Sequence, residues 1–115
     1  MGESKVHKDL KEEFAGKTGR TEVRLPSGRI VDAVSGTGIV TEVELDGRAG
    51  QKAAVSRQKE AQAIGLARKV RLVVPSGKED SAVHEMRRQR LGGWVQSTDG
   101  GVKISVPKRR KSTKY

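Results

Sequence analysis

Residues 29–45, RIVDAVSGTGIVTEVEL, decide the fold of this 115-residue chain. The segments 29–34 and 39–45 are rich in Val and Ile, which favour strands, and the Ser-Gly-Thr-Gly between them is typical of a turn. Because the connection is so short, we expect the two strands to pair as an antiparallel hairpin.

Three acidic residues lie on this hairpin, and their spacing suggests a site. Successive side chains of a strand point to opposite faces, so Glu42 and Glu44 share a face, and pairing of the strands brings Asp32 near Glu42. Neighbouring carboxylates repel each other, and either a basic side chain or a divalent cation offsets that repulsion. Mg²⁺ prefers such oxygen ligands, and a bound ion activates water and stabilises charge on a phosphate. We therefore predict an Mg²⁺ (or Mn²⁺) site at these three residues; the alternative is a set of structural strand carboxylates.

The rest of the chain continues the alternation of helices and strands. Val6, Leu10 and Phe14 form an apolar stripe at helical spacing, and Pro-Ser-Gly turns follow two of the apolar segments. We expect helices at 4–15, 51–68 and 81–91, strands at 21–25 and 70–74, and a terminal hairpin of 94–97 with 102–106. This order predicts an α/β fold with an αβββαβ core and a mixed sheet flanked by helices. Residues 1–106 are expected to form a single domain, and the basic tail 107–115 to be disordered.

The charge of the chain predicts a polyanionic partner. Lys and Arg total 24 against 14 Asp and Glu, a net charge of +10. Such an excess favours nucleic acid, although it does not read sequence. The candidate contacts are Lys52, Lys59, Arg87, Arg88, Arg90, Lys108, Arg109, Arg110 and Lys111. For each helical residue among them, the alternative is a solvated side chain.

Other features limit the possible classes of protein. The chain has no cysteine, which excludes disulfides and thiolate metal sites and fits a cytoplasmic protein. No apolar run approaches the roughly 20 residues of a membrane span, so we expect no membrane partner. His7 and His84 are interpreted as solvated, and Trp94 as an anchor of a small core rather than a surface for stacking bases.

The segment GRIVDAVSGTGIVTEVELDGR (28–48) resembles the core of the PD-(D/E)XK, or restriction-endonuclease-like, nuclease superfamily. That family carries an Asp on the second strand and Glu-x-Lys on the third, and its core is αβββαβ. Asp32 and Glu42 match the pattern, whereas Glu44 stands where Lys is usual. Some members of the family carry Glu-x-Glu and cleave DNA.

The resemblance covers residues 5–75 and extends to both flanking helices. Family members often carry a Gln or Lys on the helix after the third strand, which implies Gln58 here, and some add an acidic residue from the first helix, which implies Glu13 ahead of Glu12. The family lysine orients the attacking water, and Lys52, Arg57 or Lys59 are candidates to replace its charge.

Together these features predict a metal-dependent endonuclease that hydrolyses phosphodiester bonds, with DNA favoured over RNA as the substrate. Many small nucleases of this fold dimerise, so a homodimer is an expected partner. The missing lysine favours an alternative, a non-catalytic DNA- or RNA-binding protein on the same fold, associated with a ribosome or another assembly. A third reading is a partner-binding adaptor in a larger assembly.

Overall fold

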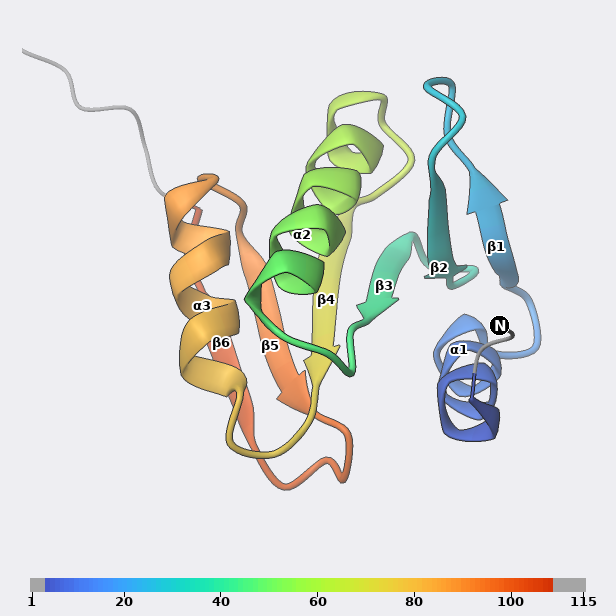
Figure 1. Cartoon of the computed structure of the whole chain (residues 1–115). Coiled ribbons are helices and arrows are strands. Elements are labelled where there is room, and N and C mark those ends of the chain that lie inside the picture. Colours follow the sequence, from blue (N-terminus) through green and yellow to red (C-terminus); the bar gives the residue numbers. More distant parts are fainter. Residues whose placement is uncertain (1–3, 109–115) are drawn as a thin grey trace, which may run out of the picture.

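The computed structural model describes residues 4–108, and these form three helices and six strands (Figure 1). The helices are α1 (Lys5–Ala15), α2 (Arg48–Ala63) and α3 (Glu79–Arg88). The strands are β1 (Arg20–Arg24), β2 (Ile30–Val34), β3 (Ile39–Val43), β4 (Lys69–Val74), β5 (Gly93–Ser97) and β6 (Lys103–Val106).

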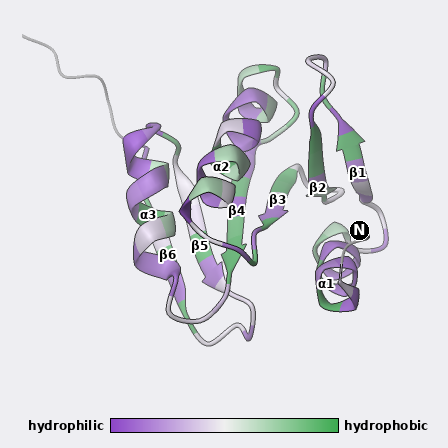
Figure 2. Ribbon diagram, in the orientation of Figure 1, coloured by the Kyte–Doolittle hydropathy of each residue, from purple (hydrophilic) through white to green (hydrophobic). Residues whose placement is uncertain are grey.

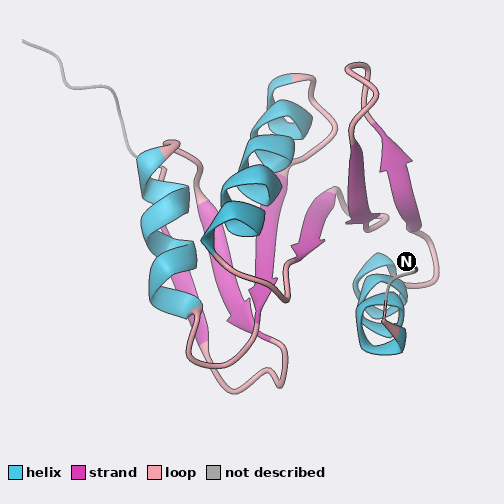
Figure 3. Cartoon of the chain, in the orientation of Figure 1, coloured by secondary structure: helices cyan, strands magenta, loops and turns pink. Residues whose placement is uncertain are grey.

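The strands lie in one mixed sheet in sequence order, β1 to β6 (Figure 3). β1, β2 and β3 are antiparallel neighbours, and β5 and β6 form an antiparallel hairpin. β3, β4 and β5 run parallel, so each of their two connections must cross over the sheet, and α2 and α3 make these crossovers.

The helices cover the two faces of the sheet unequally. α2 and α3 pack on one face over the larger apolar core, which includes Val40 and Leu72. α1 packs on the other face against β1, β2 and β3, where Phe14 meets Val73 in a smaller core. Hydrophobic residues gather in the central strands, whereas α2 and α3 carry long hydrophilic stretches (Figure 2). No described helix covers β5 and β6 on the side of α1.

The predicted α/β class, the hairpin of residues 29–34 and 39–45 and the terminal hairpin are confirmed. The predicted helix over 51–68 was wrong at both ends: it begins at Arg48, and it ends at Ala63 because Gly65 adopts a left-handed backbone with φ of 81°. The helix expected over 81–91 spans Glu79–Arg88. Within residues 4–108, no helix combines the length and the apolar character that a membrane crossing needs.

Candidate functional site

Asp32 and Glu42 face each other where β2 and β3 separate. The register of these strands pairs Ala33 with Thr41 and Val34 with Val40, and the pairing stops there. Beyond that point each carboxylate accepts a backbone N–H of the opposite strand: Asp32 N donates to Glu42 Oε2, and Val43 N donates to Asp32 Oδ2, both at 2.7 Å. The two side chains therefore satisfy backbone donors that the diverging strands leave without ladder partners.

Glu42 is the buried member of the pair, with an exposed fraction of 1%. Arg57 of α2 donates to its Oε1 from Nε at 2.8 Å and from Nη2 at 2.6 Å. Burial raises the pKa of Glu42 from its usual 4.5 to about 8, and the nearby charge of Asp32 adds to the increase, while Arg57 and the Asp32 N–H oppose it. A buried carboxyl is thus held beside a second carboxylate and a guanidinium.

Asp32 is reached by α1 on the other face of the sheet. Lys11 Nζ lies 3.6 Å from Asp32 Oδ1, and His7 Nε2 lies 3.4 Å from Oδ2. Lys11 is itself buried, with 7% of its surface exposed, and it also lies 3.5 Å from Glu22. A buried lysine is costly unless it is paired, so these contacts fix α1 at the pair of carboxylates.

Glu44 and Glu13, the other two expected metal ligands, do not join the pair. Glu44 Oε2 accepts the backbone N–H of Asp46 at 2.9 Å, and its carboxylate lies against Gly50 in the first turn of α2, where a Cβ would be 2.4 Å from it. Glu13 is exposed on α1. No group of three or more His, Cys, Asp or Glu that could hold a metal occurs in residues 4–108, so the structure groups two carboxylates rather than three.

Gln58, matched by the resemblance, points to the backbone between β3 and β4 and is completely buried. Its Nε2 donates to the carbonyl of Arg71 at 2.7 Å and to that of Val40 at 3.4 Å. No hydrogen bond joins it to either carboxylate in the described residues. Its observed contacts fix α2 on the sheet, and α2 in turn places Arg57 over Glu42.

The candidate nucleic-acid contacts are dispersed over the surface. Lys52 and Lys59 are exposed on α2, Arg87 and Arg90 are exposed at the end of α3, and Lys108 is exposed after β6. Arg88 forms an ion pair within the protein, since its guanidinium lies 2.7 Å from Glu85. Arg109, Arg110 and Lys111 lie outside the described residues.

Two residues that contact the carboxylate pair, His7 and Lys11, were not predicted from the sequence. The sequence offered Lys52, Arg57 and Lys59 as sources of positive charge, and Arg57 is the one that contacts Glu42. Lys11 was not considered, and the interpretation of His7 as solvated was wrong, because its ring is half-buried beside Asp32. Their i, i+4 spacing on α1 is a signal that they share one face of the helix, next to the apolar stripe.

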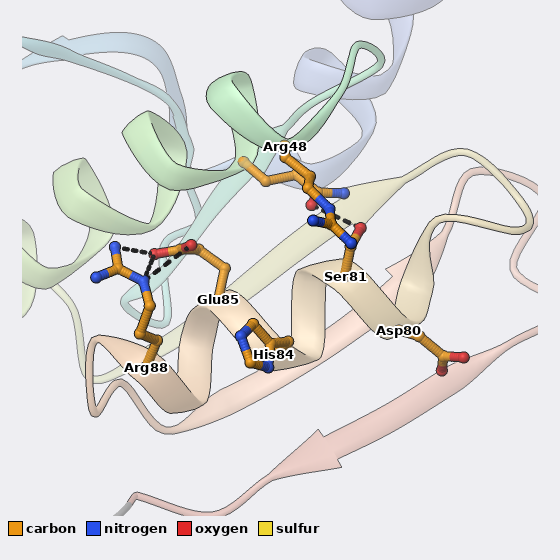
Figure 4. Close-up of a pocket in the computed structure, with 7 residues that line it drawn as sticks. Arg48, Asp80, Ser81, His84, Glu85 and Arg88 are labelled. Atoms are coloured by element: carbon orange, nitrogen blue, oxygen red, sulfur yellow. Dashed lines mark hydrogen bonds and ion pairs between the residues drawn. The ribbon is translucent and has the colours of Figure 1, made fainter.

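Apart from the pair of carboxylates, a cavity lies between α2 and α3 (Figure 4). It has a volume of about 360 Å³, and its walls carry both acidic and basic side chains. Glu85 binds Arg88 at 2.7 Å, and the hydroxyl of Ser81 donates to Gln51 at 2.8 Å. The first contact lies within α3, and the second joins α3 to α2. Because the acidic and basic charges that line the cavity largely cancel, we place the candidate site at Asp32 and Glu42.

Comparison of the chain with known protein families, with curated protein sequences and with solved structures gave no match.

Proposed function

We propose that the protein is a metal-dependent nuclease whose centre is the pair Asp32 and Glu42. The observation that supports this proposal is the meeting of the two carboxylates at the divergence of β2 and β3, where each holds a backbone N–H of the other's strand. This exchange fixes both side chains in a sheet rather than in a loop. Rigid placement of this kind is what a catalytic group requires.

The carboxylates suit a hard divalent cation. Asp32 and Glu42 would supply oxygen ligands to Mg²⁺ or Mn²⁺, and Arg57 would have to release Glu42 Oε1 or share it. A bound ion would supply Lewis-acid polarisation of the phosphodiester and acidify a water. With two protein carboxylates, the remaining ligands of such an ion would be water and substrate oxygens, as is usual for Mg²⁺ at phosphates.

Lys11 and Arg57 supply the positive charge of the site. The resemblance to PD-(D/E)XK nucleases implies a lysine beside the acidic pair, and position 44 does not provide one. Lys11 of the first helix lies 3.6 Å from Asp32, and this distance supports assigning the role of that lysine to Lys11. We propose that Lys11 orients the attacking water and that Arg57 holds Glu42 until the metal binds. The order of elements from α1 to β4, αβββαβ, is the order that the resemblance implies.

Metal-dependent cleavage is the expected result of a direct assay. Purified protein incubated with supercoiled plasmid, linear duplex, branched DNA or RNA should cut at least one DNA substrate in Mg²⁺ or Mn²⁺, and EDTA should stop the reaction. Gel electrophoresis of the products measures the cutting. If every substrate stays intact in both metals while the protein binds it, the nuclease proposal fails.

The second candidate is a nucleic-acid-binding protein without catalysis. The observation that favours it is that the carboxylates already have protein partners: Arg57 contacts Glu42, and Lys11 and His7 contact Asp32. The pair can therefore be stable as a structural feature that needs no metal. Binding that is unaffected by EDTA, without cleavage, is the result that this candidate predicts.

A further inference from the structure

A basic groove lies at the end of the sheet where β4 and β5 begin and β6 ends, next to the last turn of α2. Its volume is about 550 Å³, within the range of pockets that hold small ligands, and it opens around β4, β5 and β6. Four of its lining residues are basic, and none of the described residues that line it is acidic. These four are Arg68, Lys69, Lys103 and Lys108. The cavity between α2 and α3, in contrast, is lined by both Asp80 and Glu85.

The wall of this groove also presents an aromatic ring. Trp94 is half-buried on β5 and belongs to neither apolar core, so its interpretation as a core anchor was wrong. The register places it beside Arg71 of β4, whose guanidinium lies 5.2 Å from the ring centroid, and Lys103 Nζ lies 4.9 Å from the same centroid. The ring is therefore held on the sheet among cations, at the surface rather than inside it.

The backbone beside the ring is packed too closely to admit side chains at two positions. Gly93 has φ of 154°, and a Cβ there would meet the carbonyl oxygen of Val70 at 2.3 Å, so the chain can pass this point only with glycine. A Cβ on Gly92 would meet the backbone N of Lys108 at 2.8 Å. These two glycines thus allow the backbones of Val70 and Lys108 to approach the chain next to Trp94, and they bring Lys108 to the edge of the groove.

The groove is separate from the carboxylate pair. It lies at the beginning of β4 and β5, at Lys69 and Gly93, whereas Glu42 is near the end of the parallel neighbour β3, opposite Leu72. Its lining residues include neither carboxylate nor any of the cations that contact them. A ligand held in the groove would therefore contact the protein away from the proposed centre.

We propose that this groove binds single-stranded nucleic acid, with phosphates on its Lys and Arg side chains and an unpaired base against Trp94. Four cations, with no acidic side chain among the described residues that line the groove, attract a phosphodiester backbone of any sequence. A base in a duplex is stacked between its neighbours, whereas an unpaired base can lie against an aromatic ring in a groove. The groove shares with the proposed nuclease only the class of partner, and it requires neither metal nor cleavage.

The fluorescence of Trp94 tests this proposal, because it is the only tryptophan in the chain. The full chain is titrated in EDTA with a 12-nucleotide oligothymidylate, and we expect saturable quenching. The double variant Lys69→Ala/Lys103→Ala should bind at least about tenfold more weakly, and its plot of log affinity against log salt should be shallower by about 1.4, the value for two phosphate contacts on a single strand.

The matched control is Lys5→Ala/Lys17→Ala, which removes the same charge from two exposed lysines outside the groove. Circular dichroism checks that both double variants remain folded, which we expect because all four lysines are exposed. An absence of quenching would overturn the proposal, as would equal losses in the two double variants. Equal quenching by polyphosphate or by a duplex would show phosphate attraction without an unpaired base, and it would also overturn it. Since EDTA prevents cleavage, none of these outcomes depends on the nuclease proposal.

Discussion

Asp32→Asn and Glu42→Gln should each lower Mg²⁺-dependent cleavage by about a thousandfold. The metal supplies several kcal/mol of stabilisation to the charge that develops on phosphate, and each 1.4 kcal/mol corresponds to a factor of ten in rate. The amide side chain of each variant keeps an oxygen that accepts a backbone N–H, so the hydrogen bonds between β2 and β3 are retained. Initial rates on the best DNA substrate, measured with saturating Mg²⁺, give the effect.

Asp9→Asn is the matched control for these variants. Asp9 is an exposed carboxylate on α1, and its replacement removes the same charge. We expect the cleavage rate of this variant to match that of the wild type. If folded Asp32→Asn or Glu42→Gln protein cleaved DNA at the wild-type rate, the metal would have to bind elsewhere. The reason for assigning catalysis to the pair would then be removed.

The second large effect is on the pH dependence of stability. The pKa of Glu42 is about 8 in the folded protein and 4.5 when the group is unperturbed. Between these values the folded state holds a proton that the unfolded state has lost, so the stabilisation from this group is complete below pH 4.5 and is lost as the pH rises through 8. The free energy of unfolding should fall by up to about 1.4 kcal/mol per pH unit across that range.

Glu42→Gln removes this titration, because glutamine is neutral at every pH. Urea unfolding of the metal-free proteins is measured at pH 5, 6, 7 and 8. Over this range the free energy of unfolding of the variant should rise relative to that of the wild type by a few kcal/mol in total. The free energy of unfolding of the Asp9→Asn control should change with pH by the same amount as that of the wild type. If the Glu42→Gln curve also runs parallel to that of the wild type, the pKa of Glu42 is not raised by burial.

Much of the fold follows from local sequence patterns. The alternation in residues 29–45 and the Ser-Gly-Thr-Gly turn predict the hairpin, and Asp32 then falls opposite Glu42 as a matter of register. The spacing of Val6, Leu10 and Phe14 predicts α1, and Ser4 begins it by accepting the N–H of His7. These features depend on neighbours within a few residues, and for that reason sequence reveals them.

The surroundings of the pair depend on geometry that no local pattern contains. Alternation places Glu44 on the face of Glu42, but β3 ends at Val43, and the Glu44 carboxylate turns to the backbone of Asp46. Which cation reaches Glu42 is set by the rotation of α2 against the sheet, and that rotation selects Arg57 over Lys52 and Lys59. Lys11 approaches Asp32 because α1 packs on the opposite face, a long-range contact between segments 21 residues apart in sequence.

Titration of divalent metal into the protein tests the central claim most directly, since it asks whether Asp32 and Glu42 hold an ion. Isothermal titration calorimetry with Mn²⁺ should show saturable binding to the wild type and to Asp9→Asn, and the binding should disappear in both Asp32→Asn and Glu42→Gln. The same Mn²⁺ isotherm in all four folded proteins, or no binding to the wild type, would contradict the assignment of a metal centre to this pair.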